Sequence, residues 1–364
     1  MRVTANMSAD NSVYNIQQAR TRLDKLQEKI TTSQNINRPS DDPIATNLLL
    51  DIGDKLKNLE QYNTNIVKAQ SWMKFSDAAL SGINDIMTQT KSLMNTITTG
   101  SNDSNQRQSV HNQLIELKKQ IIDMANTQYG DQYIFGGANN TVQPFQQKTG
   151  DITTGTTTVS NISLTGLTVD MQVSGTGIPS GTFISSITAG PPPSIELSNA
   201  VTATATGSTL NFYAGDGTER VIEIAPGADQ NISITGDRLL KGVGTGPSFG
   251  STDILKTFDE LIVAVGDYTT LSDVNAITSA GVALSKASDQ VFSAVNTNLS
   301  RMVRVETMSK LNEINKDTLN DILGNIQAPD MVKLGVQLNN EQNAFEASLS
   351  ATAKLSQLSL LDYL

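Results

Sequence analysis

The feature that most constrains this chain is a long apolar stripe that begins after two closely spaced prolines. From Pro43 to Thr99 apolar residues recur at steps of three and four, which is the spacing of one face of an α-helix. At 1.5 Å per residue such a helix is a rod of about 80 Å. The stripe consists of Leu49, Ile52, Leu56, Leu59, Ile66, Met73, Leu80, Ile83, Met87, Met94 and Ile97. A rod of this length cannot bury its own stripe, so the sequence predicts further helices beside it.

The start of this helix is marked by its local sequence. Pro39 disfavours helical backbone at Arg38 and therefore ends the preceding helix. Asp42 is a good N-cap, because a residue before proline prefers extended backbone and Pro43 gives up no useful amide at the first helical position. Asp41 and Asp42 also form a pair of carboxylates, but capping accounts for them without a metal or a catalytic role. We predict that Arg38, Pro39, Asp42 and Pro43 form a structural turn and helix cap.

Each end of the chain predicts a helix with one narrow apolar edge. Near the N-terminus this edge runs from Ile16 to Ile30, and near the C-terminus a helix capped by Asp330 carries a similar edge almost to the last residue. Such an edge is covered either by the other terminal helix or by neighbouring copies. We expect both edges to lack an internal partner until neighbours bury them. The predicted assembly interface is Ile16, Leu23, Leu26, Ile30, Phe345, Leu349, Leu355, Leu358 and Leu361.

The middle of the chain contains a second helix followed by a region without helical spacing. A second helix carries an apolar stripe from Val110 to Met124 and ends near Gly130, which predicts an antiparallel hairpin with the long helix. Between 140 and 250 the helical spacing disappears, and short apolar runs alternate with Gly, Thr and Ser. VIEI (221–224) and NISITG (231–236) are expected to be strands, and the weakly charged stretch 150–212 predicts a small added β sandwich or barrel.

The predicted fold class is α+β, with a long antiparallel helical coiled-coil core built from both termini and an inserted all-β outer domain. The expected segments are a terminal axial helix with an export signal (1–40), a helical hairpin (41–139) and the outer β domain (140–250, with 150–212 as the additional module). Helices that complete the core (251–328) and a C-terminal axial helix (329–364) follow.

Composition narrows the function classes. The net charge of −10 opposes binding to nucleic acid or to an anionic membrane surface. The chain has 0 Cys and 1 His, so it lacks the usual ligands for zinc and the usual general bases. We therefore expect no catalytic site, no cofactor and no metal. The N-terminus lacks the apolar stretch of a Sec signal, and no window reaches the length of a membrane helix, so export would need another route.

Three segments, in this order and spacing, carry a resemblance to one family. NRPSDDPIA (37–45) resembles the turn that flagellins and hook–filament junction proteins place after their first helix. GDQYIFGGAN (130–139) is similar to the passage from helical hairpin to outer domain in the junction proteins, and AFEASLSATAKLSQLSLLDYL (344–364) resembles their C-terminal end. The chain therefore resembles the hook-associated proteins of the flagellin family, and residues 150–212 depart from their usual outer domain.

The resemblance implies a structural subunit of the bacterial flagellum that forms the junction between hook and filament. It implies type III export, a secreted and extracellular location, and a cytosolic chaperone that holds the C-terminal helix before export. The implied partners are further copies in a ring, a neighbouring hook-associated protein and flagellin.

Three alternatives remain open at this point. A flagellin-like filament subunit shares the terminal helices, and a phage tail fibre or surface coiled-coil scaffold shares the long helices and the β decoration. A surface hydrolase would have to use Asp216, Glu219 and Glu223, the clustered acids of the β region, which also suit a turn and an exposed strand face.

Overall fold

The computed structural model describes residues 5–99, 104–242, 252–266 and 274–361. It divides into two compact units, which we call the terminal unit (residues 1–61 and 311–364) and the central unit (residues 62–310). Two long helices, α2 (Pro43–Thr99) and α6 (Val274–Gln327), each contribute residues to both units. Within the described residues no helix is both long enough and apolar enough to cross a bilayer.

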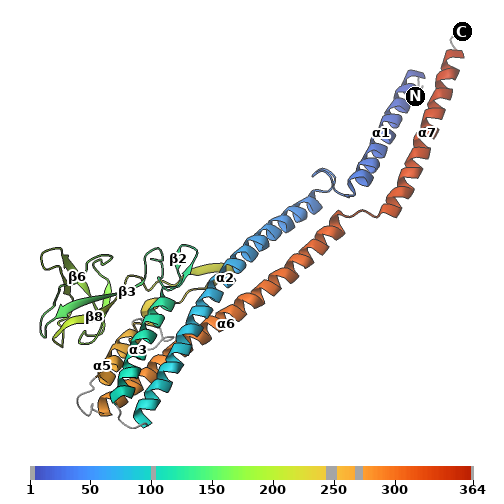
Figure 1. The fold of residues 1–364 in the computed structure, drawn as a ribbon. Coiled ribbons are helices and arrows are strands. Elements are labelled where there is room, and N and C mark those ends of the chain that lie inside the picture. Colours follow the sequence, from blue (N-terminus) through green and yellow to red (C-terminus); the bar gives the residue numbers. More distant parts are fainter. Residues whose placement is uncertain (1–4, 100–103, 243–251, 267–273, 362–364) are drawn as a thin grey trace. The chain divides into compact units, whose positions relative to one another are not determined.

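The terminal unit contains the two helices nearest the chain ends. Helix α1 (Ala5–Thr32) packs alongside α7 (Met331–Leu361), as Figure 1 shows. The first turns of α2 and the last turns of α6 complete the unit, and an ion pair between Lys316 and Glu60 (3.5 Å) links them. Helices α1, α2 and α7 occur where the spacing of apolar residues predicts them.

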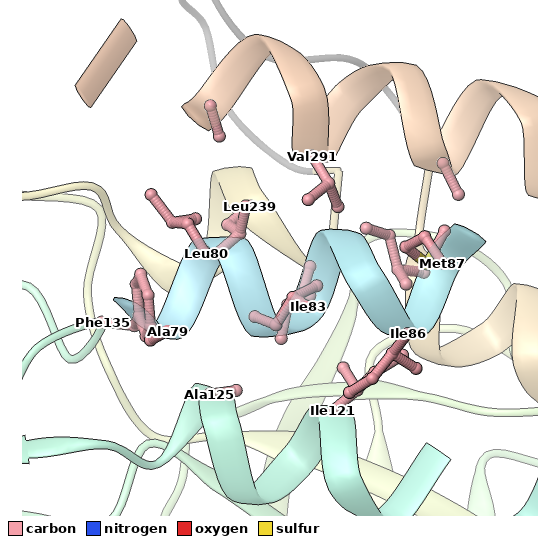
Figure 2. Close-up of a cluster of buried hydrophobic side chains, with 14 of the residues drawn as sticks. Ala79, Leu80, Ile83, Ile86, Met87, Ile121, Ala125, Phe135, Leu239 and Val291 are labelled. Atoms are coloured by element: carbon pink, nitrogen blue, oxygen red, sulfur yellow. The ribbon is translucent and has the colours of Figure 1, made fainter. Parts of the chain in front are cut away.

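The helices of the central unit share one hydrophobic core. Helices α3 (Ser104–Ala125) and α5 (Ile254–Gly266) pack together, and α6 runs antiparallel to α2 (Figure 1). In Figure 2, α2 lies between α6 and α3: Leu80 and Met87 lie on the side of Val291, and Ile83 and Ile86 lie on the side of Ile121 and Ala125. The stripe of α2 is therefore buried here by several helices at once, as its length requires.

A closed antiparallel barrel forms the β module. Its strand order is β3-β4-β7-β6-β5-β8, and its interior is a second hydrophobic core with Val159, Ile184 and Phe212 among its buried residues. The strands are β3 (Phe145–Ile152), β4 (Thr158–Ser160), β5 (Gln172–Ser174), β6 (Thr182–Thr188), β7 (Ser194–Leu197) and β8 (Ala205–Tyr213). The barrel begins at Phe145 rather than at 150, because Phe145 pairs directly with Tyr213.

Two short β hairpins flank the barrel in the sequence. The first joins β1 (Gln128–Tyr129) to β2 (Gln132–Tyr133), and the second joins β9 (Val221–Ala225) to β10 (Ala228–Asn231). The strand predicted at NISITG is therefore wrong. Gly227 adopts a left-handed backbone (φ 66°), so the chain reverses there and pairing resumes at Ala228, three residues before the predicted strand. The short helix α4 (Gly236–Leu239) follows.

A buried polar network fixes the barrel to the helices of the central unit. Lys118 of α3 donates to Asp259 of α5 (2.6 Å), whose second oxygen accepts from the Asn211 side chain of β8 (2.8 Å). Lys241 donates to the Ser174 hydroxyl of β5 (2.5 Å) and to the Asn211 carbonyl (3.0 Å). Burial raises the pKa of Asp259, against the opposing effects of Lys118 and Asn211. The position of the barrel on these helices is therefore fixed, because moving it would leave these buried charges without partners.

The α+β class predicted from the sequence, with a long helical region and a separate β domain, is confirmed.

Candidate assembly surface

The predicted turn and cap lies in the terminal unit, between α1 and α2. Asp42 Oδ1 accepts hydrogen bonds from the amides of Ile44 and Ala45, both at 3.0 Å. Helix α2 begins at Pro43, whose missing amide costs the helix nothing at this position. This is the N-cap geometry that the Asp-Pro pair predicts.

Asp41 stabilises the turn rather than the helix. Its Oδ2 accepts from the Arg38 amide (3.1 Å), and Lys25 of α1 lies 3.7 Å from Oδ1. Partial burial raises the pKa of Asp41, but the amides of Arg38 and Asn37 and the charge of Lys25 outweigh it, so the pKa lies below its usual value. The carboxylate is thus occupied by backbone and lysine. Among the described residues no group of three His, Asp or Glu side chains is placed to hold a metal ion.

The same turn reaches the break between α6 and α7. The Asn35 amide donates to the Gln327 carbonyl at 2.7 Å, and Lys29 donates to the Asn35 side chain. Beyond the break Asp330 caps α7 by accepting from the amides of Val332 (3.1 Å) and Lys333 (3.0 Å). Both interruptions of the helices, one at each end of the chain, are therefore held at the same place in the terminal unit.

The predicted apolar edges of α1 and α7 face each other. Ile16, Leu23, Leu26 and Ile30 are half-buried, as is Phe345 of α7. Arg22 of α1 donates to Glu341 of α7 at 3.2 Å, which ties the two helices together at their surface. The expectation that both edges lack an internal partner is not what the structure shows. Two neighbouring helices with matching stripes bury them against each other, because this removes apolar surface from water within one chain.

This coverage is incomplete. A two-helix pair buries only the facing side of each helix, and Val332 (80% exposed), Val336 (57%) and Leu349 (44%) of α7 remain accessible. On α1 Val13 and Tyr14 are also exposed. Of the predicted interface residues, the side chains of Leu355, Leu358 and Leu361 lie outside the described part of the structure. The backbone of α7 extends to Leu361.

Sequence reasoning missed the exposed side of α7. Val332 and Val336 are four residues apart and so lie on one face of the helix, next to the exposed Met331. The four-residue spacing of Val332 and Val336 is visible in the sequence, but the longer apolar stripe through Leu334 and Leu338 indicates a different face of this helix. The structure shows that Leu334 is buried, whereas the two valines are exposed.

The three clustered acids of the β region have structural partners. Asp216 accepts from the amides of Ala138 (2.7 Å) and Thr218 (3.0 Å), and Glu223 accepts from the Gly227 amide (3.1 Å). Glu219 lies between Arg238 (3.4 Å) and Arg301 (3.1 Å), so it is not on the exposed strand face that the sequence suggested. Each carboxylate is therefore used to hold a turn, a hairpin or a helix.

Known flagellar proteins are similar to part of this chain. Residues 3–140 match the family model of the bacterial flagellin N-terminal helical region. Flagellar hook-associated protein 3 of Salmonella typhimurium is 24% identical over 151 residues, or 41% of this chain and 48% of that protein. The Escherichia coli protein of the same name is 23% identical over 151 residues, with the same shares. The chain therefore spans about half the length of the curated relatives it matches.

Among solved structures, that of a flagellar hook-associated protein from Vibrio parahaemolyticus is similar, with a TM-score of 0.55. The match covers 79% of this chain and 100% of that chain at 15% identity, so it bears on the fold alone. These findings confirm the resemblance recognised in the sequence: residues 3–140 match the N-terminal helical region of the bacterial flagellins, and the chain is similar to flagellar hook-associated proteins over part of its sequence and in its fold.

Proposed function

We propose that this protein is a structural subunit of the bacterial flagellum that forms the junction between hook and filament and so supports assembly and motility. The observation that carries the proposal is the incompletely covered helix pair α1–α7, in a chain whose residues 3–140 match the flagellin helical region. Such a pair holds its shape in one chain yet still offers apolar surface to neighbours.

The physical basis is burial of the remaining apolar surface in the assembly. Burying about 1,000 Å² of apolar surface contributes about 25 kcal/mol before costs. Most of this is offset by the ordering of the terminal helices and by the loss of free motion on association. The surplus holds a subunit in the ring, and the interface is the predicted set of seam residues together with Val332 and Val336 of α7.

The proposed partners follow from this position. They are further copies of the chain in a ring, a neighbouring hook-associated protein on the hook side and flagellin on the filament side. Before export by the type III apparatus a cytosolic chaperone holds the C-terminal helix, and the assembled protein lies outside the cell in the flagellum. No catalytic role is part of the proposal, since the clustered carboxylates serve structural contacts.

Electron microscopy of cells that lack this protein tests the proposal. We expect hooks that carry no filament, with flagellin released into the medium. A plasmid copy of the wild-type gene should restore filaments. Filaments of normal length and number on the mutant hooks would contradict a junction role, and hooks that are themselves absent would place the protein at an earlier step.

A further inference from the structure

A polar cleft in the central unit has no role in the function proposed above. It lies between strand β10 and helix α6 and has a volume of about 590 Å³. Asp229, Gln230 and Asn231 line one side. The other side is a polar face of α6, formed by Asn296, Thr297, Ser300, Arg301 and Arg304.

The charge of this cleft differs from that of the chain as a whole. Glu219 is a single carboxylate shared by two guanidinium groups, at 3.4 Å from Arg238 and 3.1 Å from Arg301. Arg304 is exposed and forms no ion pair with any residue that the structure describes. The lining of the cleft therefore carries two arginines, Arg301 and Arg304, against one acid, Asp229. The adjacent Arg238 and Glu219 balance each other, in a chain whose net charge is −10. A surplus of positive charge at a concave site favours a ligand that carries carboxylates.

The chain itself supplies such a ligand. Glu313, Asp317 and Asp321 of α6 are exposed, and four-residue spacing places them on one face as an acidic ladder with steps of about 6 Å. In the described residues these three carboxylates form no ion pair. Of the two arginines that line the cleft, Arg301 is already paired with Glu219, so the exposed Arg304 is the one that can meet a carboxylate of the acidic ladder.

We propose that the basic cleft of one copy binds the acidic ladder of a second copy. The two surfaces are different, so the contact is heterologous and can continue from subunit to subunit until a ring closes. This inference rests on the proposed function, in which copies of the chain form a ring. The inference names the two surfaces that meet in the ring. Because the contact is partly ionic, we expect it to weaken as the salt concentration rises.

Cysteine cross-linking in isolated flagella tests the contact. The chain has 0 Cys, so the double variant R304C/D317C carries the only thiols of the protein. A bismaleimide with a span of about 8 Å cannot join the two positions within one α6, since they are about 20 Å apart along the helix. We expect covalent dimers, trimers and larger oligomers on a denaturing gel, because a head-to-tail contact leaves one free thiol at each end.

The matched control is R304C/D51C. Asp51 is likewise an exposed acid on a long helix, but it is paired with Lys55 at 2.7 Å and lies outside the acidic ladder. We expect no covalent oligomers from this control. The inference would be overturned if R304C/D317C attached to flagella without forming covalent oligomers, or if the control formed them in equal amount. Either result would leave the proposed function intact. Absence of the wild-type protein from flagella would instead contradict the proposed function.

Charge reversal provides an independent readout. We expect R304E and D317R each to reduce the amount of flagellum-bound protein about tenfold, and the double variant R304E/D317R to recover most of it. A double variant that binds no better than the weaker single variant would also overturn the inference.

Discussion

At the scale of single residues, Lys241 is held in an unusual environment for a cation. It lies in the interior of the central unit, and its amine donates to the Ser174 hydroxyl and to the Asn211 carbonyl rather than to a carboxylate. Burial lowers the pKa of Lys241 to about 8, although Asp253 and Asp259 act in the opposite direction. The folded protein therefore binds the Lys241 proton less strongly than the unfolded chain does.

This sets the sign of a pH effect on stability. Between the folded pKa of about 8 and the unfolded value of 10.5, the unfolded chain binds more protons, so the contribution of Lys241 to stability rises with pH. We expect the free energy of unfolding of the wild type, minus that of K241M, to increase by about 2 kcal/mol from roughly pH 7.5 to roughly pH 9.5. Chemical denaturation of both proteins across this range measures it.

The exposed Lys119 offers the matched control, since K119M removes the same charge from the surface of α3. Its difference from the wild type should not follow the Lys241 trend. A difference between wild type and K241M that falls, or stays level, as pH rises would show that the Lys241 amine is not held in an unfavourable environment.

At the scale of elements, the packing of α1 on α7 decides how the chain ends behave before assembly. Each helix alone has a narrow apolar edge and would be unstable in water. Together they cover the facing side of each edge, and the Arg22–Glu341 ion pair contributes little because it is exposed. The pair should therefore open and close as one unit.

A charge placed in this seam should loosen the partner helix as well as its own. We expect L26D to destabilise the pair by about 1–3 kcal/mol, because Leu26 is half-buried between the helices. Hydrogen exchange of the α7 amides from Leu334 to Lys354 should become faster. The neighbouring exposed residue provides the control Q27D, which should leave α7 exchange unchanged. Equal exchange of α7 in L26D and in the wild type would mean that the two helices fold independently.

At the scale of the whole molecule, the folding of the central unit and the attachment function use different residues. The two hydrophobic cores of the central unit are built from residues between Ile66 and Val305. The residues proposed for attachment lie on α1 and α7, in the terminal unit. Damage at the C-terminus should therefore affect assembly without unfolding the barrel.

Deletion of residues 355–364 tests this separation. We expect circular dichroism and the unfolding transition of the central unit to stay as in the wild type, while the amount of protein on hook ends falls at least about tenfold. A variant with the same ten residues in scrambled order controls for length and composition. Normal attachment of either variant would show that the spacing of Leu355, Leu358 and Leu361 is not used.

The sequence predicted most of the helical architecture because helices depend on local signals. The cap at Asp42, the cap at Asp330 and the spacing of the α2 stripe are each contained within a few turns of chain, and the structure has helices α2 and α7 starting one residue after these caps. Strand positions were less accurate. The second strand of the β9–β10 hairpin was wrong because a left-handed glycine fixed its register, and that depends on the turn rather than on the strand residues.

What the sequence determined by itself is therefore the set of helices, their interruptions at Pro39 and Pro329, and the presence of a weakly charged β module. Only the tertiary structure decided which apolar faces cover one another, that the module closes as a barrel seated on Lys118, Asp259 and Lys241, and that α1 and α7 bury part of their edges within one chain. The reason is physical: a helix or a cap depends on residues a few positions apart, whereas burial and ion pairing depend on residues brought together from distant parts of the chain, from Asn211 and Lys241, 30 positions apart, to Lys118 and Asp259, 141 positions apart.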